Sequence, residues 1–175
     1  FEASNPLYTE DDFTFSGTDS VTAVNAGSHS MELKAEDFTN TNTNFANVTF
    51  VIVDKQMVIK PIDVTVTVTG ANNTTDYDGT AHTVEGFTAT ADSTLYDVVK
   101  DFTFSGSKSV SRTDAGTTKM GLEADQFTNN NTNFNVTFDV KDGYQTISPI
   151  DVTVNVVGAT NTTDYDGKEH EVIGY

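Results

Sequence analysis

The residues with the clearest potential for chemistry lie in an acidic turn at positions 76–79, which reads Asp-Tyr-Asp-Gly. The same four residues recur at positions 164–167, 88 residues later. Carboxylate oxygens two residues apart beside a turn glycine are the kind of ligand that Ca²⁺ prefers. The sequence therefore raises one metal hypothesis, a calcium site at Asp76 and Asp78 or at Asp164 and Asp166.

The neighbouring residues argue against the strongest form of that hypothesis, an EF-hand loop. With Gly79 at the sixth position of the loop, Glu85 falls at the twelfth, where a bidentate acid is needed. However, Thr74 occupies the first position, and Ile173 replaces Glu85 in the second copy. We predict no bound metal and no cofactor, and we keep the looser two-carboxylate calcium site as the alternative.

Signatures of catalysis are absent from the sequence. His82 and His170 are repeat equivalents 88 residues apart, too distant in an array of separate domains to share a zinc ion. No cysteine and no Gly-x-Ser-x-Gly motif supplies an activated nucleophile. The 26 acidic residues lie in no recognisable glycosidase setting. We predict that the chain is not an enzyme and has no catalytic residue.

Charge and hydropathy limit the partners. The net charge is −17, from 26 acidic and 9 basic residues, and it repels phosphate backbones and anionic lipid surfaces. No stretch approaches the roughly 20 apolar residues that a membrane-spanning helix needs. We therefore expect no nucleic-acid partner and no membrane insertion.

A long internal repeat organises the chain. Residues 147–158 repeat residues 59–70 almost word for word, and the Asp-Phe-Thr-Phe-Ser-Gly motif at 12–17 recurs at 101–106. A repeat of about 88 residues is large enough to form its own hydrophobic core and is too long to be one unit of a solenoid. We expect tandem domains arranged like beads on a string.

Alternating residues predict short strands within each repeat. Ile62, Val64, Val66 and Val68 alternate with polar residues, which predicts a strand with one buried face. The repeated Phe-Thr-Phe motifs predict paired core rings by the same argument. Seven or eight such strands per repeat, without a sustained helical period, predict an all-β antiparallel sandwich or barrel.

Turn signals divide these strands. Asp142-Gly143 predicts a hairpin, and Pro61 and Pro149 predict strand ends. The Asn/Thr runs at 39–44 and 128–133 predict loops, because short polar side chains compete for backbone hydrogen bonds. Tyr77 is expected to pack back on the sheet.

Four motifs together resemble a known family. They are Ile147-Ser148-Pro149, Tyr77-Asp78-Gly79, Ala115-Gly116-Thr117 and the Asn-Phe-Asn-Val-Thr-Phe run at 133–138. The order of these motifs along the chain and their spacing together resemble the MBG/YDG-type repeats of bacterial surface proteins. The resemblance implies β-rich, immunoglobulin-like modules strung in tandem in large extracellular, cell-wall-associated adhesins. It implies a stalk or spacer role, with neighbouring repeats of the same chain as partners and no catalytic residues.

Two phases of the repeat are consistent with the sequence. Counted from proline to proline, 62–149 is one complete repeat, 1–61 is the C-terminal part of one and 150–175 is the N-terminal part of the next. The alternative phase gives 1–86 and 87–175 as two whole units. Because the chain begins at Phe1 and ends inside a repeated motif, we expect it to be part of a longer protein.

The leading functional prediction is a spacer that projects a binding region from the cell surface. One alternative is a module that itself binds a host protein or glycan, through surface residues that differ between copies, such as Tyr144 against Gln56 or the pair Val51 and Val53. The other is a subunit of an extracellular filament, in which the ends of neighbouring chains exchange strands.

Overall fold

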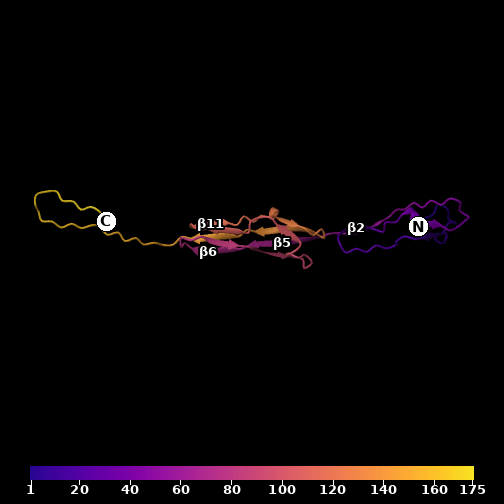
Figure 1. The fold of residues 1–175 in the computed structure, drawn as a ribbon, viewed down its shortest axis with the longest axis horizontal. Helices are drawn as coiled ribbons and strands as arrows, with labels where there is room; N and C mark the ends of the chain where they lie inside the picture. The colour runs from indigo at the N-terminus through magenta and orange to yellow at the C-terminus, as the bar shows by residue number, and fades with distance from the viewer.

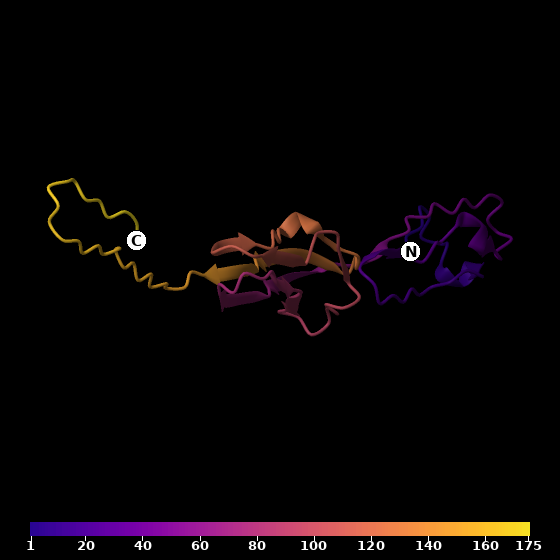
Figure 2. The same cartoon turned by 60° about the vertical axis from the view of Figure 1, so that its left-hand side comes forward.

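The computed structural model describes residues 1–175 and shows a chain built almost entirely of short β-strands. The strands form six small sheets of two or three strands each, and the only helices are single 3-10 turns. The prediction of an all-β chain is confirmed. The chain is drawn out along one axis, with the N-terminal part at one end and residues 150–175 at the other (Figures 1 and 2).

The N-terminal part contains two antiparallel strand pairs. Strand β1 (Phe13–Phe15) pairs with β3 (Phe38–Asn40), and β2 (Gly27–Ser30) pairs with β4 (Gln56–Ile59). The 3-10 turns η1 (Glu10–Asp12) and η2 (Ala35–Asp37) precede β1 and β3. The Phe13 ring lies 5.7 Å from Phe38 and 5.6 Å from Phe50, so an aromatic cluster holds this part together.

The central part holds ten strands between Ile62 and Ser148. Their bounds are β5 (Ile62–Gly70), β6 (Asn72–Asp76), β7 (His82–Glu85), β8 (Phe87–Ala91), β9 (Phe102–Phe104), β10 (Ser109–Arg112), β11 (Gly116–Lys119), β12 (Phe127–Asn129), β13 (Phe134–Lys141) and β14 (Tyr144–Ser148), with the 3-10 turn η3 (Ala124–Gln126) before β12. They form the sheets β13-β5-β8, β11-β14-β6, β10-β7 and β12-β9.

The core of the central part is built on the predicted inward face of β5. Val64, Val66 and Val68 are buried and pack with Tyr96, Phe127 and Phe134. The predicted alternation is therefore confirmed for the three valines. Ile62, the fourth residue of the pattern, stays 44 % exposed because it begins the strand, beyond the packed centre.

Two strand pairings are parallel, and there the antiparallel prediction is wrong. Strand β13 runs parallel to β5 from Phe134 opposite Ile62 to Lys141 opposite Thr69. Strand β14 runs parallel to β6, with Tyr144 opposite Asn72 and Ser148 opposite Asp76. The first and last strands of the unit are therefore neighbours, and they run side by side through both three-stranded sheets.

The predicted hairpin at Asp142-Gly143 is also wrong. The chain passes through these residues without reversing, from β13 in one sheet to β14 in the other, just as it passes through Ala71 from β5 to β6. The Asp142 carboxylate accepts the backbone N–H groups of Gly121 and Leu122 at 3.1 and 2.9 Å. Glycine is needed at 143 because a Cβ there would collide with the Ala71 carbonyl oxygen.

The predicted Asn/Thr loops are confirmed for residues 41–44 and 130–133, together with their mechanism. The prediction is wrong for residues 39–40 and 128–129, which end strands β3 and β12 because they pair with β1 and β9. The Asn129 Nδ2 donates to the carbonyl oxygens of Asn131 and Phe134 at 2.9 and 3.0 Å. Its equivalent in the N-terminal part, Asn40, donates to the carbonyl oxygens of Asn42 and Phe45 at 3.1 and 3.3 Å. The asparagine side chains thus order these loops by bonding to their own backbone.

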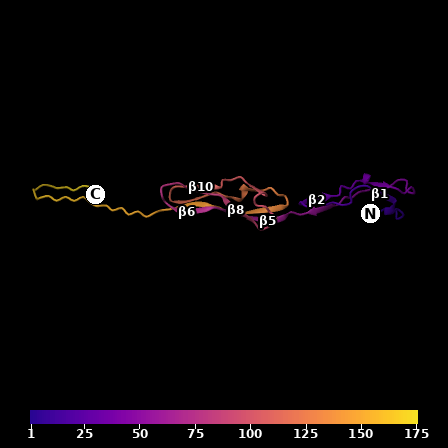
Figure 3. The same cartoon turned by 60° about the horizontal axis from the view of Figure 1, so that its bottom comes forward.

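Residues 150–175 contain no strand and lie exposed to solvent. They double back on themselves beyond the last strand (Figure 3), and the backbone N–H of Ala159 donates to the Gly174 carbonyl oxygen at 3.1 Å. Val154 is 74 % exposed here, whereas its repeat equivalent Val66 is fully buried.

Replacing Gly143 with alanine tests the crossing point between the two sheets. The added Cβ meets backbone rather than a flexible side chain, so we expect Gly143→Ala to lower the free energy of unfolding by about 3 kcal/mol. Urea denaturation measures the effect. Gly158→Ala is the matched control, because a Cβ there meets open space. Equal stability of the two variants would contradict the crossing geometry.

Candidate functional site

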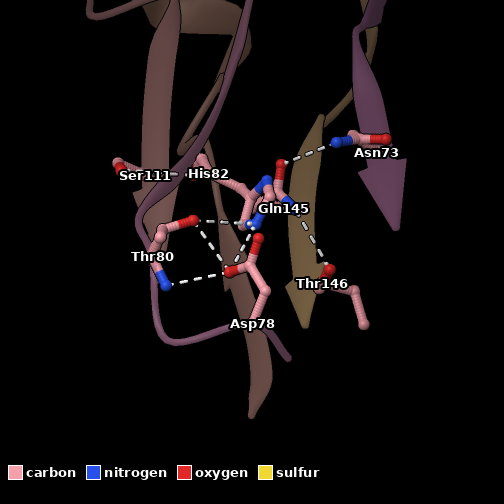
Figure 4. A network of polar contacts seen from close by, with 7 residues as sticks. All are labelled: Asn73, Asp78, Thr80, His82, Ser111, Gln145 and Thr146. Carbon is pink, nitrogen blue, oxygen red and sulfur yellow. Dashed lines mark hydrogen bonds and ion pairs between the residues drawn. The ribbon is translucent and has the colours of Figure 1, made fainter. Parts of the chain in front are cut away.

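The acidic turn after β6 is folded around the carboxylate of Asp78. Its Oδ1 accepts the backbone N–H and the hydroxyl of Thr80, both at 2.8 Å. The same oxygen lies 3.1 Å from His82 Nε2 at the start of β7 (Figure 4). An aspartate side chain that accepts the backbone N–H of the residue two positions later commonly closes a tight turn. Gly79 lies within this turn and adopts its positive φ of 79°.

These donors shift the titration of the carboxyl group. The backbone N–H of Thr80, then its hydroxyl, and then the His82 ring lower the pKa of Asp78 from its ordinary 3.8 to about 2. Because the folded-state pKa lies below the unfolded value, the ionised carboxylate stabilises the fold above about pH 4. That contribution is lost as the pH falls from 3.8 toward 2.

The trio Asp78, Thr80 and His82 has the residue types of a hydrolytic triad but not its geometry. In a working triad the carboxylate and the nucleophile contact opposite ring nitrogens of the histidine. Here the carboxylate and the Thr80 hydroxyl, which is 3.5 Å away, both approach Nε2. The hydroxyl also donates to the carboxylate itself, so no proton relay through the ring is set up. The arrangement closes a turn.

The two carboxylates of the calcium hypothesis have different settings. Asp78 is occupied by its own turn, whereas Asp76 ends β6 opposite Ser148 and makes no side-chain hydrogen bond. Nowhere in residues 1–175 do three or more His, Cys, Asp or Glu side chains converge on one point. The structure thus gives calcium no multi-carboxylate cage at this turn.

The second acidic turn repeats part of this geometry in the exposed segment. Asp166 Oδ1 accepts the backbone N–H of Lys168 and lies 3.0 Å from His170 Nε2. Lys168 replaces Thr80, so the hydroxyl contact is missing. Asp164, the other carboxylate of the hypothesis, makes no side-chain hydrogen bond. His82 and His170 lie in separate parts of the chain, as their spacing predicted.

A buried glutamine beside the turn escaped the sequence reasoning. Gln145 on β14 is fully buried; its Oε1 accepts the Asn73 amide at 3.3 Å and its Nε2 donates to the Thr146 carbonyl oxygen at 3.1 Å (Figure 4). It is the only polar residue of this sheet that is buried as a whole, and its hydrogen bond to Asn73 joins β14 to β6. The sequence offered one signal for this residue: in the alternation of strand β14, residue 145 falls on the same face as the apolar Ile147.

A pair of buried tyrosines was also missed. The Tyr96 hydroxyl lies 3.0 Å from the Asp101 carbonyl oxygen and 3.2 Å from Asn129 Oδ1. Tyr8 repeats the pattern, at 3.3 Å from the Asp12 carbonyl oxygen and 3.1 Å from Asn40 Oδ1. Burial raises the pKa of the Tyr96 phenol, as expected for a structural hydroxyl. The sequence offered one signal for this pair: the two tyrosines are 88 residues apart, which is the period of the repeat.

A shallow depression with a volume of about 540 Å³ lies over β5 and β13. Short polar side chains, the carboxylates of Asp63 and Asp92 among them, line it beside Phe134. Its lining contains no histidine and no lysine. The three helical segments, η1, η2 and η3, are single 3-10 turns of three residues each, so none of them could span a bilayer.

The Asp78 turn predicts a specific acid response. Asp78→Asn keeps an oxygen for the Thr80 N–H but cannot titrate, so we expect the loss of stability between about pH 4 and pH 2 to become less steep. Urea denaturation at a series of pH values measures this slope. Asp76→Asn is the control. If the slope of Asp78→Asn matched that of the unsubstituted chain, the assigned role of the carboxylate would be wrong.

Searches of protein-family models, of curated proteins and of solved structures find no match to this chain.

Proposed function

We propose that residues 1–175 form a tandem-repeat segment of MBG/YDG type that serves as a stalk or spacer in a large extracellular bacterial surface adhesin. In this role the chain holds a binding region away from the cell surface and carries no chemistry itself. The observation that supports the proposal is the recurrence of one antiparallel strand pairing, β1-β3 and β9-β12, in two parts of a chain drawn out along one axis.

The same strand pairing occurs twice in the same register. In the N-terminal part Phe13 lies opposite Asn40 and Phe15 opposite Phe38. In the central part the corresponding pairs are Phe102 with Asn129 and Phe104 with Phe127. A 3-10 turn precedes β3 in one copy and β12 in the other. The sequence repeat therefore corresponds to equal local structure, as expected of tandem modules.

The central part supports a small sandwich-like module. The β9-β12 pair lies over the sheet β13-β5-β8, because the Phe138 ring is 5.5 Å from both Phe102 and Phe127. Phe87 on β8 lies 5.3 Å from Phe127. We infer an immunoglobulin-like unit running from Pro61 to Pro149, which is the proline-to-proline phase of the repeat.

The junction between the first two parts is short and bonded. Only Lys60 and Pro61 separate β4 from β5, and proline fixes its own φ. Across the junction, Asn133 Nδ2 donates to Asn25 Oδ1 at 3.1 Å, and the Ala26 N–H donates to Asn133 Oδ1. A stiff connection of this kind is what a spacer needs, because a flexible one would let the array collapse.

Small-angle X-ray scattering of a dilute solution tests the proposed spacer shape. We expect an extended particle with the cross-section of one module, unchanged by millimolar calcium. Asn133→Ala removes the two junction bonds and is expected to broaden the distribution of particle lengths, whereas the exposed neighbour Thr132→Ala leaves it unchanged.

A compact particle would contradict the spacer role. So would saturable binding of the isolated chain to host proteins or glycans in an array experiment, because that result would favour a binding module instead. In that case Tyr144, which is 37 % exposed on β14, is the first aromatic residue to substitute.

A further inference from the structure

The first and last strands of the central part form one continuous parallel ladder, which lies in the path of a force that stretches the chain. We propose that this ladder makes the central part a mechanical clamp, which resists stretching between Pro61 and Pro149 because its strands are loaded in shear. The inference rests on the proposed function only for the direction of the load.

A stretching force enters and leaves the central part at opposite ends of this ladder. Strand β5 begins the unit at Ile62, and β14 ends it at Ser148. In Figures 1 and 3 the chain enters the central part from the side of the N-terminal part and leaves it at the opposite side. The force therefore draws residues 62–76 toward one end of the molecule and residues 134–148 toward the other.

Parallel strands that are loaded in this way must slide past each other. The two segments run side by side in one direction, with eight residue pairs between β5 and β13 and five between β6 and β14. Because they are pulled in opposite directions along their length, all hydrogen bonds of the ladder share the load. In an antiparallel hairpin the outer ends of the strands lie together, so a pull on them opens the bonds one after another. The parallel direction therefore decides the mechanical response.

Hydrogen bonds continue between the two sheets and at both ends of the ladder. Three backbone N–H groups donate to carbonyl oxygens of the facing segment: Ile62 to Asn133 at 3.1 Å, Tyr144 to Ala71 at 3.2 Å and Tyr77 to Ser148 at 2.9 Å. The first and last of these bonds lie at the two ends of the ladder, and the middle one spans the crossing from one sheet to the other. The strands of both three-stranded sheets therefore resist the load as one ladder.

Side-chain bonds also join the two segments that would slide. Asn135 Nδ2 donates to Asp63 Oδ1 at 3.0 Å in the first sheet. In the second sheet Asn73 Nδ2 donates to the Oε1 of the buried Gln145 at 3.3 Å. The two residues of each pair lie directly opposite each other in the ladder, so a slip of the strands breaks both bonds together with the backbone ladder.

The hydrophobic core opposes a partial slip of the ladder. Val64, Val66 and Val68 of β5 are at most 2 % exposed and form the core. A slip of one residue would bring the intervening threonines onto the core face, because successive side chains point to opposite faces of a strand. The next register that restores the pattern lies two residues away, or about 6.6 Å. The clamp therefore keeps one register until the whole ladder breaks.

Single-molecule force spectroscopy of the full chain tests the proposal. The chain has no cysteine, so two cysteine substitutions define the pulling points. Lys60→Cys with Ile150→Cys loads the ladder in shear. Lys60→Cys with Thr132→Cys is the matched control, because it peels β5 and β13 apart from the end at which both strands begin. All three positions are exposed, so the substitutions leave the fold intact.

We expect the rupture force in shear to be at least about twofold higher than the peeling force at the same loading rate, because forced unfolding is governed by the unfolding barrier and only shear must break the whole ladder to cross it. Rupture in shear should release the central part in one step, at roughly 3.5 Å of contour length per residue. Thermal unfolding of the two double variants should be the same, which separates the direction of pull from stability.

Gly143→Ala tests whether the crossing between the sheets belongs to the clamp. The added Cβ meets the Ala71 carbonyl oxygen of the facing segment. We expect a lower rupture force in shear and an unchanged peeling force, because the first bonds beside Ile62 set the peeling force. Gly158→Ala lies outside the ladder and is expected to leave both forces unchanged.

Equal rupture forces in the shear and peeling directions would overturn the proposal. A shear force that Gly143→Ala leaves unchanged would overturn it as well. An extended particle in scattering with equal rupture forces would overturn only this inference and leave the spacer role standing. A compact particle whose rupture force depends on direction would instead overturn the spacer role and leave the clamp.

Discussion

The parallel pairing of β5 and β6 with β13 and β14 is the contact on which the rest of the structure depends. It joins the first and last strands of the unit, so the core valines of β5 are covered only when the chain has returned some 70 residues later. Pairing over that sequence distance carries a loop-closure entropy that only simultaneous burial offsets.

Polar groups in this protein serve the fold. Asparagine side chains order the long loops, Asp78 closes a turn, and Asp142 holds the crossing between sheets. Gln145 and the two buried tyrosines satisfy interior hydrogen bonds within the strands and loops around them. Nowhere in residues 1–175 do three or more His, Cys, Asp or Glu side chains converge as they would around a metal ion.

Sequence reasoning predicted what depends on local pattern. Alternation predicted which valines of β5 are buried, and side-chain chemistry predicted the asparagine-ordered loops. Sequence reasoning failed where the structure depends on which strands pair, because alternation specifies the buried face of a strand but not its partner or its direction. The Asp142-Gly143 pair was read as a hairpin, although its glycine is required by close approach to Ala71. Tyr77 was expected to pack on the sheet but is 40 % exposed, since its turn projects beyond β6. No local pattern distinguished it from the buried Tyr96.

The two near-identical valine strands give the most direct test of the central pairing. Residues 64–68 and 152–156 read Val-Thr-Val-Thr-Val and Val-Thr-Val-Asn-Val, so their intrinsic amide exchange rates are similar. Hydrogen exchange followed by mass spectrometry at high dilution should show strong protection of 64–68 together with 136–140, and little protection of 152–156. Equal protection of the two segments in the monomer, or free exchange of both, would contradict the claim that pairing with β13 makes β5 part of a core.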